Sequence, residues 1–409
     1  MTTSLQSLFV AGLILALVQL IAAVPWLWAL DPRGFRKSLT NPTVLGYSVG
    51  ALIAIAAILA WFMSENRILA KLNEYGYYYG AILHGQIAID FLILMPRLLL
   101  FISPKTGAVA LAAFREGWRQ PIFWLVNVLA TVLILLSMVV PYFTFGEDYK
   151  MMKQIGFDVV MLSAALFGLL AASISINEEI EGRTAITVMS KPINRRQFLI
   201  GKYLGTLMAC WAMMMFLGWV LTWALYIKPH FDKLDDVFDP MPNEVATLLT
   251  PKFDKAVPTP EGKAFATGIA KWCGEALAHH AGLLLVFGQV MVLLSICIAL
   301  ATRMQFTINL VICFFVFLIG HLAPVLVLAT QQMAQGNDAL KLVHFIAQLL
   351  NAIFPALEYF DMGPAIIRDS IVPMRDFTIY VGSVFGYAVL YSGIGILIGL
   401  ILFEDRDLA

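Results

Sequence analysis

The sequence predicts an all-α, polytopic integral membrane protein, a helical bundle of about nine transmembrane helices. Hydrophobic residues make up 60% of the 409 residues and charged residues only 13%, whereas soluble domains carry roughly 25% charged residues. In water, a fold of this composition would expose large apolar surfaces, and lipid removes that cost. The formal net charge is 0, so we expect no nucleic acid partner.

Nine apolar segments approach the length of about 20 residues that a helix needs to cross the hydrocarbon core. Three lie in an N-terminal membrane region, residues 1–104, and six in the region 105–409. The third segment is the weakest because it carries His84, Asp90 and Arg97. The nine predicted spans are residues 8–30, 44–63, 79–102, 122–144, 159–176, 203–227, 281–301, 307–329 and 377–403.

Lysine and arginine in the short loops predict the orientation, because cytoplasmic loops carry an excess of both. Loops 31–42, 103–120 and 177–202 are basic, and Arg303 follows the seventh span. With these loops in the cytoplasm the spans alternate, the N-terminus lies outside and the C-terminus is cytoplasmic. We therefore expect a multi-pass protein of the cell inner (plasma) membrane, surrounded by the lipid bilayer.

Two segments expected on the outer side are longer. Residues 228–280 are polar and rich in proline, and they predict an external loop. Residues 331–376 have apolar residues at helical spacing but also charged ones such as Lys341 and Glu358. This pattern predicts an amphipathic or re-entrant external segment rather than a full span.

The most informative stretch is residues 177–205, which read NEEIEGRTAITVMSKPINRRQFLIGKYLG. Acidic residues come first, where a helix dipole favours them. Lys191 precedes Pro192, which disfavours helical backbone at that point. The pattern predicts a short amphipathic helix, a proline-set turn and a basic anchor at the headgroups. An ordinary solvated loop is the simpler interpretation of these residues taken alone.

This stretch resembles the cytoplasmic coupling segment of ABC-2-type transporter permeases. Residues 111–124, LAAFREGWRQPIFW, resemble the interfacial helix before that family's first span, and residues 402–408, LFEDRDL, resemble its cytoplasmic tail. The resemblance covers about residues 105–409 and leaves the first three spans without a family counterpart. The residues that carry the coupling pattern are Glu178, Glu181, Gly182, Thr184, Ser190, Pro192, Arg195, Gly201 and Lys202.

The resemblance implies a permease subunit that moves an unidentified substrate with ATP hydrolysed by a separate ABC ATPase subunit. It implies a second permease copy or paralogue as a further partner. Residues 185–190 would pack against the ATPase, and Arg195, Arg196 and Lys202 would anchor the segment at anionic headgroups. The expected ATPase-coupling residues are Glu178, Glu181, Gly182, Arg183, Thr184, Ser190 and Pro192.

The chain itself is not expected to be an enzyme. Gly201-Lys202 lacks the upstream glycine and the following serine or threonine of a phosphate loop. We therefore expect no cofactor bound directly, with ATP and Mg²⁺ held by the partner ATPase. The four cysteines show no metal-ligand spacing and predict inert packing rather than a metal site.

A candidate intramembrane polar site comprises His84, Asp90, Arg97 and His321, because ionisable groups are costly in lipid. Asp90 and Arg97 are seven residues apart, roughly on one helix face. An ion pair or a subunit contact competes here with a proton relay. Two other function classes stay open: a quinone- or haem-associated respiratory membrane subunit, and an ion-coupled secondary transporter, for which internal repeats would be expected.

Overall fold

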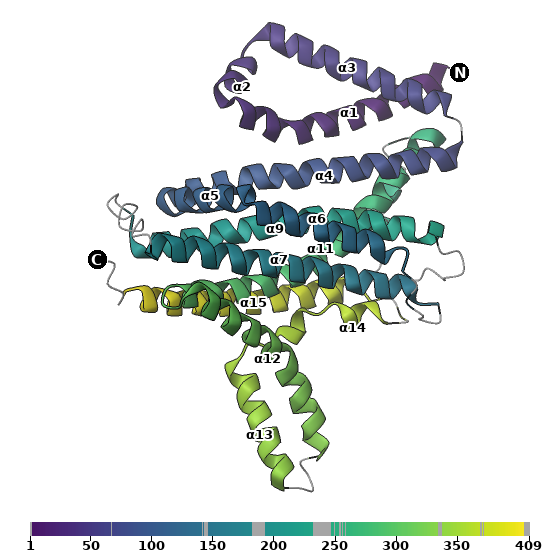
Figure 1. Cartoon of the computed structure of the whole chain (residues 1–409). Helices are drawn as coiled ribbons and strands as arrows, with labels where there is room; N and C mark the ends of the chain where they lie inside the picture. Colours follow the sequence, from purple (N-terminus) through teal and green to yellow (C-terminus); the bar gives the residue numbers. More distant parts are fainter. Residues whose placement is uncertain are drawn as a thin grey trace. The chain divides into compact units, whose positions relative to one another are not determined.

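The computed structural model is entirely helical over the residues it describes (Figure 1). These are residues 2–66, 68–140, 142, 146–181, 193–231, 247–248, 250–252, 255, 257, 259–333, 338–368, 370 and 372–404. The main helices are α1 (Thr2–Leu30), α2 (Pro32–Ser38), α3 (Pro42–Glu65), α4 (Leu69–Ile102), α5 (Pro104–Arg119), α6 (Pro121–Ser137), α7 (Asp148–Glu181), α9 (Arg195–Phe231), α11 (Pro260–Ala301), α12 (Phe306–Met333), α13 (Asp338–Ile353), α14 (Gly363–Ile366) and α15 (Met374–Glu404), with the 3₁₀-helix η1 (Leu357–Phe360).

The predicted membrane bundle is confirmed. Eight helices of the described chain are long and apolar enough to cross a membrane, and a ninth candidate arises if α5 and α6 form one broken span. These two helices meet at a 59° bend. Gln120 has extended backbone at the bend, and Pro121 begins α6. A proline fits the first turn of a helix because the amide hydrogen it lacks would be unpaired there.

The helices differ from the predicted spans mainly in where they begin. The seventh span was expected at residues 281–301, but α11 begins at Pro260, inside the segment predicted as an external loop. Polar side chains such as Lys271 and Glu275 lower the hydropathy of its first half without opposing helix formation. Likewise α4 begins at Leu69, ten residues before the predicted third span, and α6 ends at Ser137.

The described residues divide into two compact units. The first comprises Met1–Leu98 with Pro242–His279, and the second comprises Leu99–Met241 with His280–Ala409. The N-terminal region was expected to consist of residues 1–104. The first unit also contains the first half of α11, which clusters with the N-terminal helices.

Small residues allow close helix contacts in the first unit. A Cβ added at Gly76 of α4 would collide with the backbone of Phe265 in α11, and one at Gly268 of α11 would collide with Asn73 in α4. Trp272 is fully buried beside Gly80. This close approach explains why α11 stays helical through its polar first half.

The second unit contains α5, α6, α7, α9, the second half of α11, and α12 to α15. Its core is formed by α7, α9 and α11, with Ile176, Phe198 and Leu294 almost fully buried. Helix α12 and α13 form a hairpin that projects from the other helices of this unit (Figure 1). The predicted amphipathic external segment thus contains α13, η1 and α14.

Helices α5 and α9 pack against one another through small residues. A Cβ at Gly201 would lie 2.6 Å from Cβ of Val109. A Cβ at Gly205 would lie 2.6 Å from Cβ of Ala113 and would collide with the carbonyl oxygen of Ala110. Helices that approach this closely gain dispersion contacts along their whole crossing, which is the main attraction available between helices in lipid.

We expect Gly205→Ala to destabilise the protein, although alanine is the better helix former. The added methyl group must displace the α5 backbone, at a cost of about 1–3 kcal/mol. Thermal unfolding in detergent or nanodiscs measures the change. Gly386→Ala in α15 is the matched control, since nothing lies within 4 Å of its added Cβ. Equal melting temperatures for the two variants would contradict the close α5–α9 packing.

Candidate functional site

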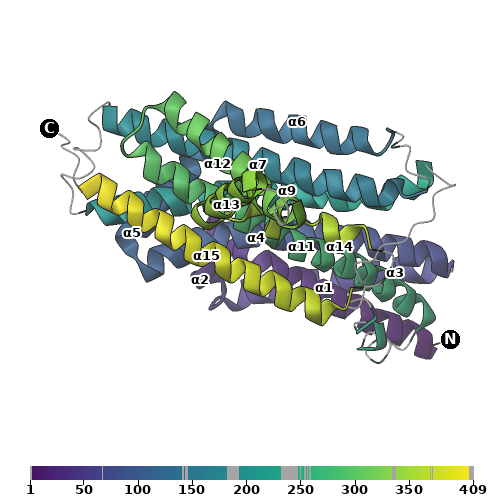
Figure 2. The same ribbon diagram turned by 90° about the horizontal axis from the view of Figure 1, so that it is seen from below.

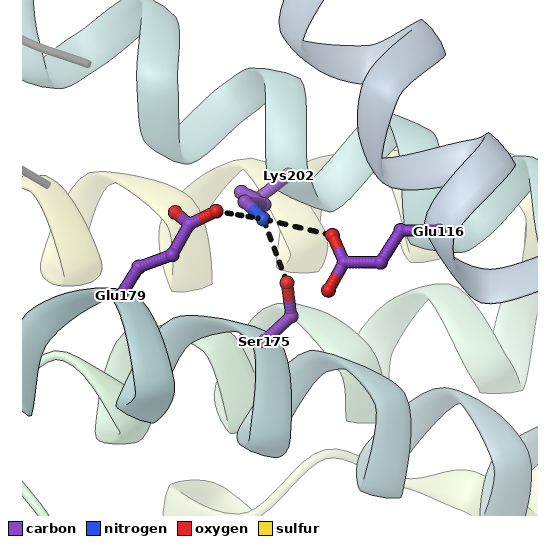
Figure 3. A network of polar contacts seen from close by, with 4 residues as sticks. All are labelled: Glu116, Ser175, Glu179 and Lys202. Carbon is purple, nitrogen blue, oxygen red and sulfur yellow. Dashed lines mark hydrogen bonds and ion pairs between the residues drawn. The ribbon is translucent and has the colours of Figure 1, made fainter. Parts of the chain in front are cut away.

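A buried lysine joins three helices at the end of the second unit where α7 stops and α9 starts. Lys202 of α9 is 5% exposed. Its Nζ lies 2.6 Å from Oε1 of Glu179 in α7 and 3.3 Å from Oε2 of Glu116 in α5. It also donates a hydrogen bond of 2.6 Å to Oγ of Ser175 in α7. Figure 3 shows these four side chains converging, and we call them the Lys202 cluster.

The energetics of the Lys202 cluster follow from its asymmetric burial. The lysine side chain is 6% exposed, whereas those of Glu179 and Glu116 are 25% and 41% exposed. A desolvated ammonium group costs several kcal/mol unless it is paired and hydrogen-bonded. Two carboxylates and one hydroxyl meet that requirement here. The cluster therefore requires α5, α7 and α9 to stay together at this end.

Lys202 was expected to contact lipid headgroups; in the structure its ammonium group is buried and paired within the protein. Arg195 also differs from the expectation. Its Nη1 donates hydrogen bonds of 2.7 Å to the carbonyl oxygen of Phe403 and 2.6 Å to that of Glu404. Of the three predicted anchors, Arg196 alone has an exposed side chain.

A second arginine holds the same end of α15. Nε of Arg303, which follows α11, donates a 2.7 Å hydrogen bond to the carbonyl oxygen of Leu402. The last carbonyl groups of a helix lack partners within the helix and carry its negative dipole end. Arg195 and Arg303 supply both donors and positive charge there. The guanidinium of Arg195 also lies 5.6 Å from the ring centroid of Phe403.

A buried polar network lies beside the Lys202 cluster. Asn309 of α12 is fully buried and donates hydrogen bonds of 3.0 Å to Oγ of Ser173 and 3.1 Å to the carbonyl oxygen of Cys297. Asn177 donates to the same serine at 3.4 Å. These bonds join α7, α11 and α12, so the end of α7 is fixed to the rest of the second unit.

The predicted coupling residues fall at the edge of the described chain. Glu178 is exposed near the end of α7, and Glu181 is the last residue of that helix. Gly182, Arg183, Thr184, Ser190 and Pro192 lie outside the described residues, so their proposed roles stay predictions. Sequence reasoning grouped loop 103–120 and Arg303 with loop 177–202, but it did not predict the contacts that Glu116, Ser175 and Arg303 make here. Glu116 had one available signal, an acidic residue within the basic pattern FREGWR.

The polar residues of α4 contact different partners within the first unit. Arg97 donates a 3.3 Å hydrogen bond from Nη2 to the carbonyl oxygen of Ala29 and lies 3.9 Å from the ring centroid of Trp28. Asp90 is 7% exposed. Although the two residues share a helix face, the described contacts of Asp90 and Arg97 include no ion pair between them.

The two candidate histidines have protein partners. Nδ1 of His84 accepts a 3.3 Å hydrogen bond from Nε1 of Trp272 in the first unit. In the second unit, Nε2 of His321 lies 3.2 Å from Nε2 of Gln289, and its Nδ1 lies 2.9 Å from the carbonyl oxygen of Phe317. Across the described part of the chain, no group of three or more His, Cys, Asp or Glu side chains has metal-binding geometry.

A cavity of about 290 Å³ opens at the other end of α15, and we call it the distal cavity. Its charged lining comes from Asp361, Arg368 and Asp376, beside Tyr380. The apolar lining includes Leu285, Met362, Pro364, Ala365, Val372 and Phe377. The cavity thus lies between α11, the segment after η1 and the first turns of α15.

Comparison with known proteins finds a family match for one segment of the chain. Residues 118–249 match the family model described as ABC-2 family transporter protein. The match contains Glu179, Arg195 and Lys202, and it begins two residues after Glu116. Searches of curated proteins and of solved structures give no match. Similarity to an ABC-2-type permease is therefore shown over this segment, which includes most of the Lys202 cluster.

We expect Lys202→Met to lower the free energy of unfolding by about 1–2 kcal/mol, because Glu116 and Glu179, which are only partly exposed, would lose their common counter-charge. Thermal unfolding of the purified protein measures this. The double variant Lys202→Met/Glu179→Gln should regain part of the loss, since one carboxylate charge is then removed. Arg196→Met is the control and should leave stability within about 0.5 kcal/mol. Additive effects of the two cluster substitutions would contradict direct pairing.

Proposed function

We propose, on the basis that residues 118–249 are similar to ABC-2 family transporters, that this chain is the permease subunit of an ABC transporter. It moves a substrate across the membrane with ATP hydrolysed by a separate ATPase subunit. That similarity carries the proposal, and the Lys202 cluster supports it, because it joins α5, α7 and α9 where residues 182–192 connect two spans.

Residues 182–192 are suited to act as the contact with the ATPase because the helices on both sides are fixed together. Glu179 and Lys202 lie 23 positions apart in the chain but are paired at 2.6 Å. A force on the connecting segment therefore acts on α7 and α9 at once. Arg195, the first residue of α9, extends the same connection to α15. A solvated loop between independent spans would lack these linkages.

The orientation is part of the proposal. The segment 182–192 faces the cytoplasm, as the basic loops around it favour. The C-terminal end of α15 lies on the same side, because Arg195 holds it beside the start of α9. The N-terminus is then outside. A second permease copy or a paralogue completes the transporter.

The partner ATPase supplies the site for ATP and Mg²⁺. Gly201-Lys202 has no role as a phosphate-binding pair in this arrangement. Gly201 is required where α5 approaches α9, and Lys202 is occupied by two carboxylates and a hydroxyl group. The described contacts of His84 and His321 do not favour the respiratory alternative, which needs histidines available to a haem.

The test is co-purification of a phosphate-loop ATPase with the tagged chain from native membranes. We expect Ile186→Asp/Val188→Asp to reduce ATPase recovery by at least about tenfold, which corresponds to roughly 1.4 kcal/mol of lost interaction. The matched control is Val237→Asp/Phe238→Asp, in a segment expected on the opposite side of the membrane. Labelling of residue 186, as a cysteine, only from outside intact cells would overturn the proposal.

A further inference from the structure

Helix α15 is a continuous helix of 31 residues (Figure 2). Its C-terminal end lies at the Lys202 end of the second unit, and its N-terminal turns line the distal cavity. At about 1.5 Å per residue the helix is roughly 45 Å long, enough to cross a membrane completely. It contains no proline, and it is helical without a break from Met374 to Glu404. A displacement of one end can therefore be passed along the helix to the other.

The C-terminal end of α15 is held by hydrogen bonds from side chains as well as by packing. Arg195 and Arg303 bind three consecutive carbonyl groups, those of Leu402, Phe403 and Glu404. These arginines come from two places in the chain, the start of α9 and the turn between α11 and α12. The ring of Phe403 is fully buried and lies 5.9 Å from that of Phe198 in α9.

The C-terminal third of α15 is in close contact with α11. A Cβ at Gly399 would lie 3.0 Å from Cα of Ala299, and one at Gly395 would lie 2.5 Å from Oγ of Ser295. These two glycines therefore lie at a helix crossing within this chain.

Three tyrosine hydroxyl groups of α15, between residues 380 and 391, hold the end of α13 and the segment that follows it. Tyr391 donates to the carbonyl oxygen of Ile353 at 3.1 Å, and Tyr380 donates to that of Tyr359 at 2.7 Å. The hydroxyl of Tyr387 accepts from the backbone amide of Ala356 at 3.1 Å. Backbone groups in lipid need such partners, because no water replaces them.

The distal cavity is built from the two parts that these tyrosines join. Helix α15 contributes Asp376, Phe377 and Tyr380 to its lining. The segment that follows η1 contributes further lining residues, among them Met362, Ala365 and Arg368. The width of the cavity therefore depends on the position of α15.

We propose that α15 couples the arginine contacts at its C-terminal end to the distal cavity, so that displacing Arg195 changes access to the cavity. The source of the displacement, an ATPase acting on residues 182–192, rests on the proposed function. The linkage itself does not, because it uses only contacts within this chain. Its failure and that of the proposed function can therefore be observed separately.

The test uses the full-length chain alone in nanodiscs, with Ala365→Cys as a reporter in the cavity lining. The measurement is the rate at which a membrane-impermeant maleimide labels the reporter. We expect Arg195→Gln and Arg303→Gln each to change that rate in the same direction, by at least about fivefold, the lower range of allosteric coupling. Arg196→Gln is the matched control, being the exposed neighbour of Arg195, and should leave the rate unchanged.

A second reporter separates coupling from general loosening of the fold. The second reporter is Val139→Cys. Val139 is exposed just beyond the end of α6, and the described interactions include no contact between it and α15. Its labelling rate should not respond to Arg195→Gln. Tyr387→Phe should remove most of the response at residue 365, although distant substitutions normally act additively. The proposal fails if both reporters respond equally, if Arg196→Gln matches Arg195→Gln, or if the effects are additive.

Discussion

One ammonium group determines how the second unit is organised where α7 ends and α9 begins. Lys202 is buried, and a buried ammonium group is costly without partners; Glu116, Ser175 and Glu179 supply them. Meeting this requirement fixes the ends of three helices at once. The small residues Gly201 and Gly205 allow α5 to approach close enough for Glu116 to reach. The ion pair between Lys202 and Glu116 thus depends on the close approach of the α5 and α9 backbones, and it helps to hold them together.

The neighbouring arginines extend this arrangement to the rest of the unit. Arg195 connects the start of α9 to the final turn of α15, and Arg303 adds the turn after α11. Asn309 connects α7 to α11 and α12 through hydrogen bonds that lipid cannot replace. The similarity of residues 118–249 to ABC-2 transporters covers the α7–α9 part of this system. A force applied at one of these interhelical contacts would therefore act on several spans together.

Hydropathy alone predicted the fold class and most of the spans, because the lipid environment requires long apolar helices. It could not predict where α11 begins. Glu275 and Lys271 lower the local hydropathy, yet Glu275 accepts a hydrogen bond of 2.5 Å from Tyr77, more than 190 residues earlier. The fate of Lys202 was unpredictable for a similar reason. Beside Arg195 and Arg196 it resembles a headgroup anchor, and only the arrival of Glu116 from α5 makes it an internal group.

The first turns of α11, residues 260–279, cluster with the N-terminal helices, whereas the rest of α11 belongs to the second unit. A truncated chain starting near residue 99 would leave Phe265, Ile269 and Trp272 without their present neighbours. Removing the N-terminal spans would therefore also expose the buried apolar side chains of those turns.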